Sequence, residues 1–161
     1  MTDYLLASEP LEGRNAHVAG RLLLAKLYAE RYGQPLPPVE RTSTGKPYFP
    51  GKDVYFSISH TQKNVFCVLS ERPVGLDAEE ADRQVKPALA RHILSPREFA
   101  QYEQAEDQRL AVLTFWVLKE AAAKLTGEGI KGYPNHTDFN LTDPRVQRLN
   151  GCLVAVLEGE I

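Results

Sequence analysis

Cysteine is scarce in this chain: only Cys67 and Cys152 occur among its 161 residues. Each lies inside an apolar run, and their separation fits neither the spacing of a zinc site nor a disulfide framework. We therefore expect both to be small buried side chains of the hydrophobic core.

Long hydrophobic runs are absent too. The longest apolar stretches fall far short of the roughly 18 residues that a membrane-spanning helix needs. Residues 1–10 also lack the basic-then-apolar order of a secretory signal. These absences predict a cytoplasmic protein that does not enter a membrane.

An excess of charge of either sign is also missing. Lys plus Arg number 19 against 21 Asp plus Glu, which gives a net charge of −2. This balance argues against a nucleic-acid binder that needs a broad basic face. With 43% hydrophobic and 25% charged residues, the composition is typical of a globular protein. The length suits a single domain over residues 1–161 rather than two independent ones.

The periodicity of apolar residues predicts mixed secondary structure. A helix is expected over residues 14–32, ended by Gly33. Its predicted apolar stripe consists of Val18, Leu22, Ala25 and Ala29. Three strand-like runs follow at 54–59, 65–69 and 74–79, and the short polar turns between them favour an antiparallel meander.

The second half of the chain repeats this order. Helix is expected from about residue 85, again from a capping box that begins at Ser95, and over 109–125. Asn150-Gly151 before an apolar run then predicts a hairpin. Because helices and antiparallel strands mix without a regular βαβ alternation, we expect an α+β fold, and the segment order suits two similar halves.

The strand 74–79 carries two carboxylates on one face. Its strict alternation turns Asp77 and Glu79 to the side opposite Val74, Leu76 and Ala78. Neighbouring carboxylates repel, and Mg²⁺ with a phosphate-bearing substrate is a common remedy. Taken alone, the pattern is more typical of an edge strand with a solvated face.

The helix over 109–125 places a second set of polar groups beside its apolar stripe. Glu120 and Lys124 lie four residues apart on the border of that stripe, with Trp116 one turn before Glu120. The three alanines 121–123 keep the helix slim there, which would allow another element or a ligand to approach closely. The alternative is an ordinary surface ion pair worth about 0.3 to 0.5 kcal/mol.

Two further segments could contact a ligand. Residues 41–47 combine Arg41 and Lys46 with hydroxyl groups and a glycine, a composition suited to phosphate, although a plain turn has the same features. In the predicted strand at 54–59, alternation places Phe56 and Ile58 in the core. Ser59 and His60 then lie at the strand end, where a ligand or only solvent would be met.

Together these segments resemble the Sfp-type 4′-phosphopantetheinyl transferases. The shared motifs are G-K-P at 45–47, F-x-I-S-H at 56–60, V-G-x-D-x-E at 74–79 and W-x-x-K-E-A-x-x-K at 116–124, in the same order and with similar spacing. Residues 19–22, Ala-Gly-Arg-Leu, also resemble the first helix of that family. The resemblance extends from about residue 14 to residue 130.

The resemblance implies a reaction and a set of roles. The 4′-phosphopantetheine arm of coenzyme A would pass to a serine of an apo acyl or peptidyl carrier protein, releasing adenosine 3′,5′-bisphosphate. Asp77 and Glu120 would hold Mg²⁺, with Glu79 as a third acidic ligand. Lys124 would contact phosphate, and Ser59 with His60 the nucleotide end of coenzyme A.

The resemblance also implies a fold of two α+β halves, roughly 1–72 and 73–161, related by a pseudo-twofold. Coenzyme A would lie in the cleft between them, and the protein would be a monomer. Only 13 residues precede Arg14, where longer members carry basic residues for the 3′-phosphate. The available substitutes are Arg14, His17, Arg41 and Lys46.

The sequence leaves some roles open. Mg²⁺ and a lysine would offset the charge that develops on the departing phosphate. Either Glu120 or a metal-associated water is a candidate base for the serine proton. Lys119 lies about 100° round the helix from Glu120 and could serve structure or catalysis. The alternative functions are a catalytically silent module that binds coenzyme A or a carrier protein, and, ranked last, a metal-dependent phosphohydrolase.

Overall fold

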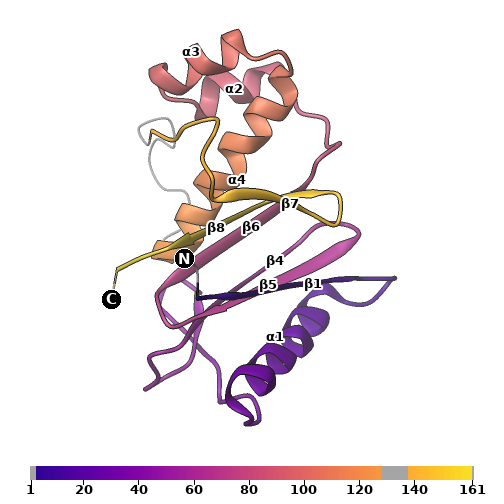
Figure 1. The fold of residues 1–161 in the computed structure, drawn as a ribbon, viewed down its shortest axis with the longest axis vertical. Coiled ribbons are helices and arrows are strands. Elements are labelled where there is room, and N and C mark those ends of the chain that lie inside the picture. The colour runs from indigo at the N-terminus through magenta and orange to yellow at the C-terminus, as the bar shows by residue number, and fades with distance from the viewer. Residues whose placement is uncertain (1–2, 128–137, 161) are drawn as a thin grey trace.

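The computed structural model describes residues 3–127 and 138–160 of the chain (Figure 1). Its helices are α1 (Ala16–Tyr32), α2 (Pro87–Ile93), α3 (Pro96–Gln104) and α4 (Gln108–Thr126). Its strands are β1 (Leu5–Pro10), β2 (Glu40–Arg41), β3 (Pro47–Tyr48), β4 (Tyr55–His60), β5 (Asn64–Ser70), β6 (Val74–Glu80), β7 (Val146–Leu149) and β8 (Cys152–Glu158). In Figure 1, α1 lies at one end of the molecule and α2 and α3 at the other, with the strands between them.

Two three-stranded antiparallel sheets share one pattern of connections. The strand order is β1-β5-β4 in the first sheet and β6-β8-β7 in the second. In each, a strand is followed by helix and then by a hairpin whose second strand pairs with the first strand. The predicted α+β class is confirmed, and the shared connectivity is compatible with two similar halves. The pseudo-twofold itself stays a prediction.

The expected meander is wrong in one respect. β4 pairs with β5, but β6 pairs with β8 instead of continuing the first sheet. The side of β5 opposite β4 pairs with β1, a strand that the periodicity of the sequence did not predict. β6 therefore begins the second sheet.

The two sheets meet edge to edge at β4 and β6. The hydroxyl of Ser57 accepts a hydrogen bond from Leu76 N at 3.1 Å, and that of Ser59 accepts one from Ala78 N at 3.2 Å. Serine side chains thus satisfy backbone donors of the neighbouring edge strand, which would otherwise be open to pairing with another chain. Apolar residues of both sheets form a common core behind this junction: Phe66, Val68, Val74, Leu76, Ala78, Cys152, Val154 and Val156.

Helix α1 buries a different face from the predicted one. Its buried residues are Ala19, Gly20, Leu23, Leu24, Leu27 and Tyr28. Val18 and Leu22, predicted to face inward, are 54% and 53% exposed. The physical reason lies at Gly20, where an added Cβ would come within 2.7 Å of Ile58 Cγ2, so α1 approaches β4 along this glycine. The predicted stop is confirmed, because Gly33 adopts the left-handed conformation at φ 65°.

Helix α4 packs on β6 and β8 as its predicted stripe requires. Leu113, Val117, Leu118 and Ala121 are buried against Leu153, Ala155 and Leu157 of β8. Contact with β6 is closest at Gly75, where an added Cβ would lie 2.1 Å from the carbonyl oxygen of Ala121. The missing side chain of Gly75 therefore permits this close approach, and the effect of the three alanines at 121–123 stays a prediction.

The predictions for the two cysteines and for the last hairpin are confirmed. Both cysteines are buried and free, and the Asn150-Gly151 turn joins β7 to β8 with positive φ at both residues. No helix in residues 3–127 or 138–160 is long and apolar enough to cross a membrane.

Candidate active site

The predicted site residue Asp77 lies where β4, β6 and α4 come together. Its side chain is largely buried, with the residue 7% exposed. Lys124 Nζ of α4 lies 3.3 Å from Asp77 Oδ1, and the Ser59 hydroxyl of β4 donates to the same oxygen at 3.4 Å. The other oxygen, Oδ2, is buried and has no hydrogen-bond partner among the described residues. An unpaired buried carboxylate oxygen is costly and open to a further ligand.

The charge on Asp77 is opposed by its surroundings. Burial raises the pKa of this carboxyl to about 7, the positive charge of Lys124 opposes the rise, and the negative charges of Glu79 and Glu120 add to it. Glu120 behaves alike: burial raises its pKa, Lys124 counteracts this, and Glu79 contributes repulsion. These three carboxylates therefore repel one another, and their meeting is what the resemblance implies.

Glu79 is held by neighbours of its own. Its Oε1 accepts a hydrogen bond from Arg83 Nη1 at 2.7 Å and another from the indole Nε1 of Trp116 at 3.2 Å. The second contact joins β6 to α4 one turn before Glu120. The structure thus brings Asp77, Glu79, Glu120 and Lys124 to one place.

The carboxylates of Asp77, Glu79 and Glu120 fit a magnesium site only in part. The described residues contain no group of three or more His, Cys, Asp or Glu side chains positioned to hold a metal ion. However, Mg²⁺ usually takes one or two carboxylates together with water and substrate phosphates. The unpaired Oδ2 of Asp77 and the repulsion among the carboxylates fit such a cation.

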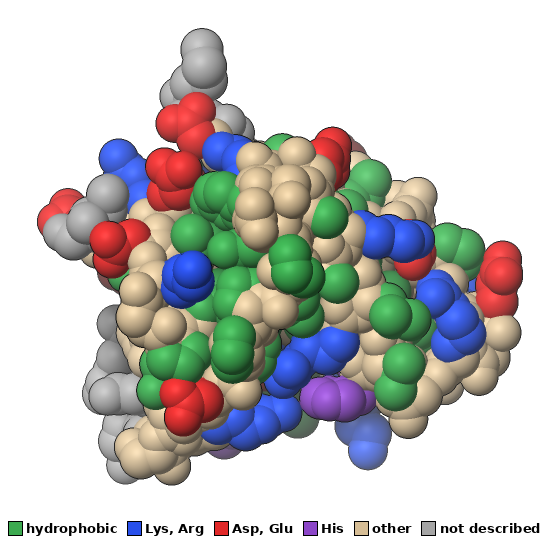
Figure 2. Space-filling model, turned by 90° about the horizontal axis from the view of Figure 1, so that it is seen from below, with side chains coloured by type: hydrophobic (Ala, Val, Ile, Leu, Met, Phe, Trp, Pro, Cys, Tyr) green, Lys and Arg blue, Asp and Glu red, His purple; other side chains and the backbone are tan. Residues whose placement is uncertain are grey.

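A cavity of about 260 Å³ adjoins this cluster. Its walls are Thr44, Gly45, Lys46, Pro47, Phe56, Ser57, Ile58, Ala123, Lys124 and Gly127. The predicted G-K-P turn, the strand β4 and the last turn of α4 therefore enclose one space, with Lys124 at its boundary with Asp77. On the face of the molecule seen from the α1 end, Lys and Arg side chains gather beside a histidine (Figure 2).

Lys46 is engaged with the end of helix α4. Its Nζ donates to the carbonyl oxygen of Leu125 at 2.8 Å and lies 3.4 Å from that of Val74, and burial lowers its pKa. The Thr44 hydroxyl donates to the carbonyl of Gly127. A cation and a hydroxyl thus satisfy carbonyl groups at the helix C-terminus, where positive charge is favourable. The segment 41–47 joins the two halves of the chain through these bonds.

The other predicted ligand residues lie in different surroundings. Ser59 is at the site, in contact with Asp77 as described above. His60 is exposed, with Nδ1 3.2 Å from the carbonyl oxygen of Thr61. The guanidinium of Arg14 donates to the carbonyl oxygens of Leu11 and Pro10 at 3.1 and 2.8 Å. Arg14 therefore closes the turn before α1, and His17 is exposed on the first turn of that helix.

Arg21 was not among the predicted site residues. It is half-buried on α1, and its pKa is lowered by burial and by the positive charge of Arg41. Arg41 itself donates to the carbonyl oxygen of Gly45 at 2.8 Å. Neither arginine forms a salt bridge with a carboxylate of the described residues, so the two like charges would be relieved by an anion. The available signal was Arg21 in the 19–22 segment that resembles the family's first helix.

Lys119, whose role the sequence left open, is buried in an ion pair with Glu98 of α3, with Nζ 2.9 Å from Oε1. Glu98 was predicted only as part of a helix cap, which it forms with Ser95. Nothing in the local sequence identifies it as the partner of a lysine 21 positions later.

Comparison with known proteins points to one family. The model of the 4′-phosphopantetheinyl transferase superfamily matches residues 73–154, just over half of the chain. This range includes Asp77, Glu79, Glu120 and Lys124.

Curated relatives agree with this match. A 4′-phosphopantetheinyl transferase of Bacillus subtilis is 32% identical over 92 residues, which are 53% of this chain and 39% of the relative. The 4′-phosphopantetheinyl transferase psf-1 of Bacillus pumilus is 31% identical over 116 residues, 69% of this chain and 49% of the relative. A holo-[acyl-carrier-protein] synthase of Limosilactobacillus reuteri is 35% identical over 77 residues, 44% of this chain and 64% of the relative. The chain thus spans less than two thirds of each of these relatives.

Proposed function

Since the chain belongs to the 4′-phosphopantetheinyl transferase superfamily, we propose that it transfers 4′-phosphopantetheine from coenzyme A to a serine of an apo acyl or peptidyl carrier protein. The second product is adenosine 3′,5′-bisphosphate. The observation that carries the proposal is the meeting of Asp77, Glu120 and Lys124 beside a cavity between the two halves.

Asp77 and Glu120 are the proposed magnesium ligands. The unpaired Oδ2 of Asp77 and the mutual repulsion of the carboxylates support this assignment. When bound, Mg²⁺ supplies positive charge that offsets the charge developing on the diphosphate. Glu79 is a further candidate ligand through its second oxygen, since Oε1 is held by Arg83 and Trp116.

Lys124 is the proposed contact to the departing phosphate. Its side chain is 35% exposed, so it can exchange its contact with Asp77 for one with an incoming anion. In the transfer, the serine oxygen bonds to the phosphorus of phosphopantetheine, and the bond from that phosphorus to the bridging oxygen breaks. The bridging oxygen leaves with adenosine 3′,5′-bisphosphate. The serine proton passes to Glu120 or to water in the site.

Coenzyme A is proposed to lie in the cavity and to extend toward Arg41, which is bonded to Gly45 of the cavity wall. Ser59, His60 and Lys46 keep their predicted roles at its nucleotide end. For the 3′-phosphate, the Arg21–Arg41 pair has better support than Arg14. The guanidinium of Arg14 already faces the carboxylate of Glu9 at 3.4 Å, whereas neither arginine of the pair forms a salt bridge with a carboxylate of the described residues. A planar guanidinium pair suits a phosphate dianion through bidentate hydrogen bonds.

Membership of this superfamily also supports a proposal about the whole chain. We propose that residues 1–161 act as one unit, with halves at roughly 1–72 and 73–161 related by a pseudo-twofold. The unit would work as a monomer, because one chain supplies every residue of the proposed site. The cytoplasm stays its predicted location.

The decisive experiment is an assay of carrier modification. The protein is incubated with coenzyme A, Mg²⁺ and several apo carrier proteins, and the intact mass of each carrier is measured. We expect the mass of one phosphopantetheine to be added, and the addition to disappear with a chelator or in Asp77→Ala. Asp143→Ala, which removes an aspartate far along the chain from the motifs, is the matched control and should retain activity.

Two other outcomes would contradict the proposal. Binding of coenzyme A without modification of any carrier would indicate a catalytically silent module. One observation favours this alternative: no three His, Cys, Asp or Glu side chains among residues 3–127 and 138–160 are positioned to hold a metal ion. Cleavage of coenzyme A with no change in carrier mass would indicate a phosphohydrolase.

A further inference from the structure

A buried ion pair lies next to the site and outside the proposed chemistry. Glu98 of α3 is fully buried, and the side chain of Lys119 on α4 is 2% exposed. Removing two charges from water costs about as much free energy as their attraction returns, and apolar replacements are often no less stable. We therefore ask which parts of the structure this pair positions, since its net contribution to stability is small.

One carboxylate joins three segments of the second half. Glu98 Oε1 accepts from Ser95 N at 2.9 Å and lies 2.9 Å from Lys119 Nζ, while Oε2 accepts from Phe139 N at 2.7 Å. Lys119 Nζ also lies 5.7 Å from the centre of the Phe139 ring. The start of α3, the middle of α4 and the segment that leads to β7 are thereby fixed to one another.

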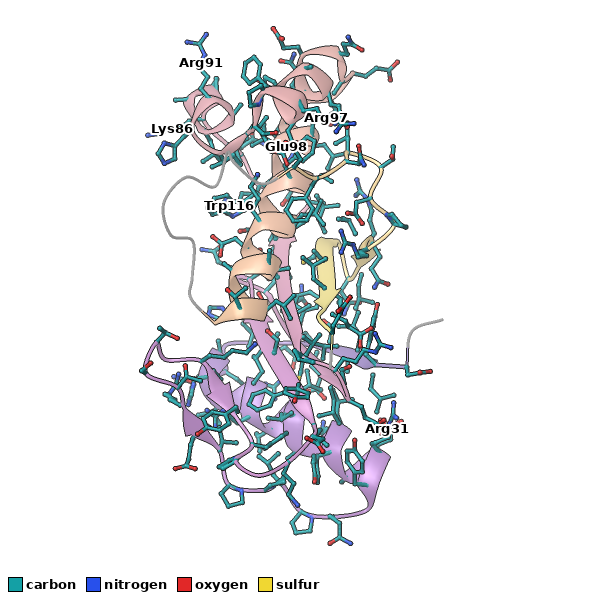
Figure 3. The ribbon with its side chains drawn as sticks, turned by 90° about the vertical axis from the view of Figure 1, so that its left-hand side faces the viewer. Arg31, Lys86, Arg91, Arg97, Glu98 and Trp116 are labelled. Carbon is teal, nitrogen blue, oxygen red and sulfur yellow. The ribbon has the colours of Figure 1, made fainter. Side chains whose placement is uncertain are left out.

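The pair also fixes the rotation of α4 about its own axis. Lys119 directly precedes Glu120, so the direction of one side chain sets that of the other at about 100°. One turn earlier, Trp116 is bound to Glu79 of β6 at 3.2 Å. In Figure 3, Glu98 lies beside the upper turns of α4, and Trp116 projects from the helix on the left. The helix therefore cannot rotate without breaking one of these contacts.

We propose that Glu98 and Lys119 are a positioning pair that sets the rotation of α4 and so directs Glu120 toward Asp77. Neither residue would touch substrate. The effect on turnover rests on the proposed transferase function, whereas the effect on the helix does not.

Trp116 provides a direct measurement of helix rotation, because it is the single tryptophan of the chain. Its indole N–H gives one resonance in a ¹H–¹⁵N spectrum, and that resonance reports the hydrogen bond to Glu79. The test variant is Glu98→Leu/Lys119→Met, which removes both charges and keeps apolar bulk. We expect it to stay folded by circular dichroism and to show a shifted indole resonance.

Kinetics then separate positioning from a purely structural role. In the double variant, kcat should fall at least tenfold while KM for coenzyme A stays within twofold, because the nucleotide site lies elsewhere. The matched control is Lys26→Met, which removes the lysine of the exposed Lys26–Glu9 pair at 2.6 Å. It should leave both the indole resonance and kcat unchanged.

A folded double variant with an unchanged indole resonance or an unchanged kcat would overturn the proposal. If the double variant does not fold, Glu98→Gln decides the question, since it keeps an acceptor for Phe139 N and removes the charge. An unchanged indole resonance in that variant would equally overturn it. If the wild-type protein modifies no carrier, the proposed function fails, yet the indole resonance still tests the rotation of α4.

Discussion

Asp77 illustrates how the charge of a proposed metal ligand can oppose stability. Burial raises its pKa from the usual value of 3.8 to about 7, so the folded protein holds this proton more tightly than the unfolded chain. Between about pH 4 and 7 the folded state therefore carries more protons, and the free energy of unfolding should fall as the pH rises through this range. Above pH 7 the full cost of the buried charge is present.

We expect Asp77→Asn to be more stable than the wild type at pH 8 in metal-free buffer, by about 1–3 kcal/mol. Each tenfold change in proton affinity is worth about 1.4 kcal/mol, and the buried amide keeps part of the cost. Urea denaturation at pH 5 and pH 8 measures the difference, which should shrink at the lower pH. A variant that is less stable than the wild type at pH 8 would contradict the expectation.

Asp143 offers a control with the opposite sign. Hydrogen bonds from Arg145 lower the pKa of Asp143, so its charge stabilises the folded state above the pKa of the unfolded chain and this contribution is lost as the pH falls. Asp143→Asn should therefore be slightly less stable than the wild type at pH 8. Opposite signs for the two asparagine variants would separate the effect of burial from that of simple charge removal.

At the scale of elements, the contact between α4 and β6 depends on one missing side chain. An alanine at position 75 would place Cβ 2.1 Å from the Ala121 carbonyl oxygen and 2.5 Å from Leu125 N, both backbone atoms that cannot turn aside. We expect Gly75→Ala to lower the free energy of unfolding by about 2–4 kcal/mol, because α4 must move away from the strand. Thermal and urea denaturation measure the loss.

Gly159→Ala is the matched control for this substitution. A Cβ there would meet side-chain atoms no closer than 3.5 Å, an ordinary contact distance. Its effect should stay within about 0.5 kcal/mol, as for most unstrained surface changes. Equal stability of the two alanine variants would show that α4 does not depend on close approach at Gly75.

The sequence predicts elements well where a local period decides them. Glu120 and Lys124 share a helix border, and Asp77 and Glu79 share a strand face, because these relations depend only on spacing along one element. The prediction of the buried face of α1 was wrong. Val18 and Leu22 are exposed, because this helix has apolar residues on several sides. There the contact with Ile58 decides, and that contact comes from a strand far along the chain.

At the scale of the whole molecule, the sequence predicts less because pairing between distant segments decides. Ser57 had no predicted role, yet its hydroxyl joins the two sheets. Its function could be seen only once β4 and β6 were known to be neighbouring edges. Arg21 beside Arg41 and Glu98 beside Lys119 depend in the same way on tertiary contacts.

The shared core behind β4 and β6 predicts that the two halves unfold together. Phe66 and Val68 of the first sheet are buried against Leu76 and Val156 of the second, so either half alone would expose this surface. Ser57→Ala leaves the buried Leu76 N–H without its acceptor, at a cost of about 1–3 kcal/mol. We expect the urea midpoint reported by Trp116 fluorescence and that reported by hydrogen exchange in β5 to coincide and to shift equally.

Ser8→Ala is the control, because the buried Ser8 hydroxyl has no partner among the described residues and its loss should cost little. Separate midpoints for the two probes would mean that the halves are independent folding units, and the serine contacts would then only dock them.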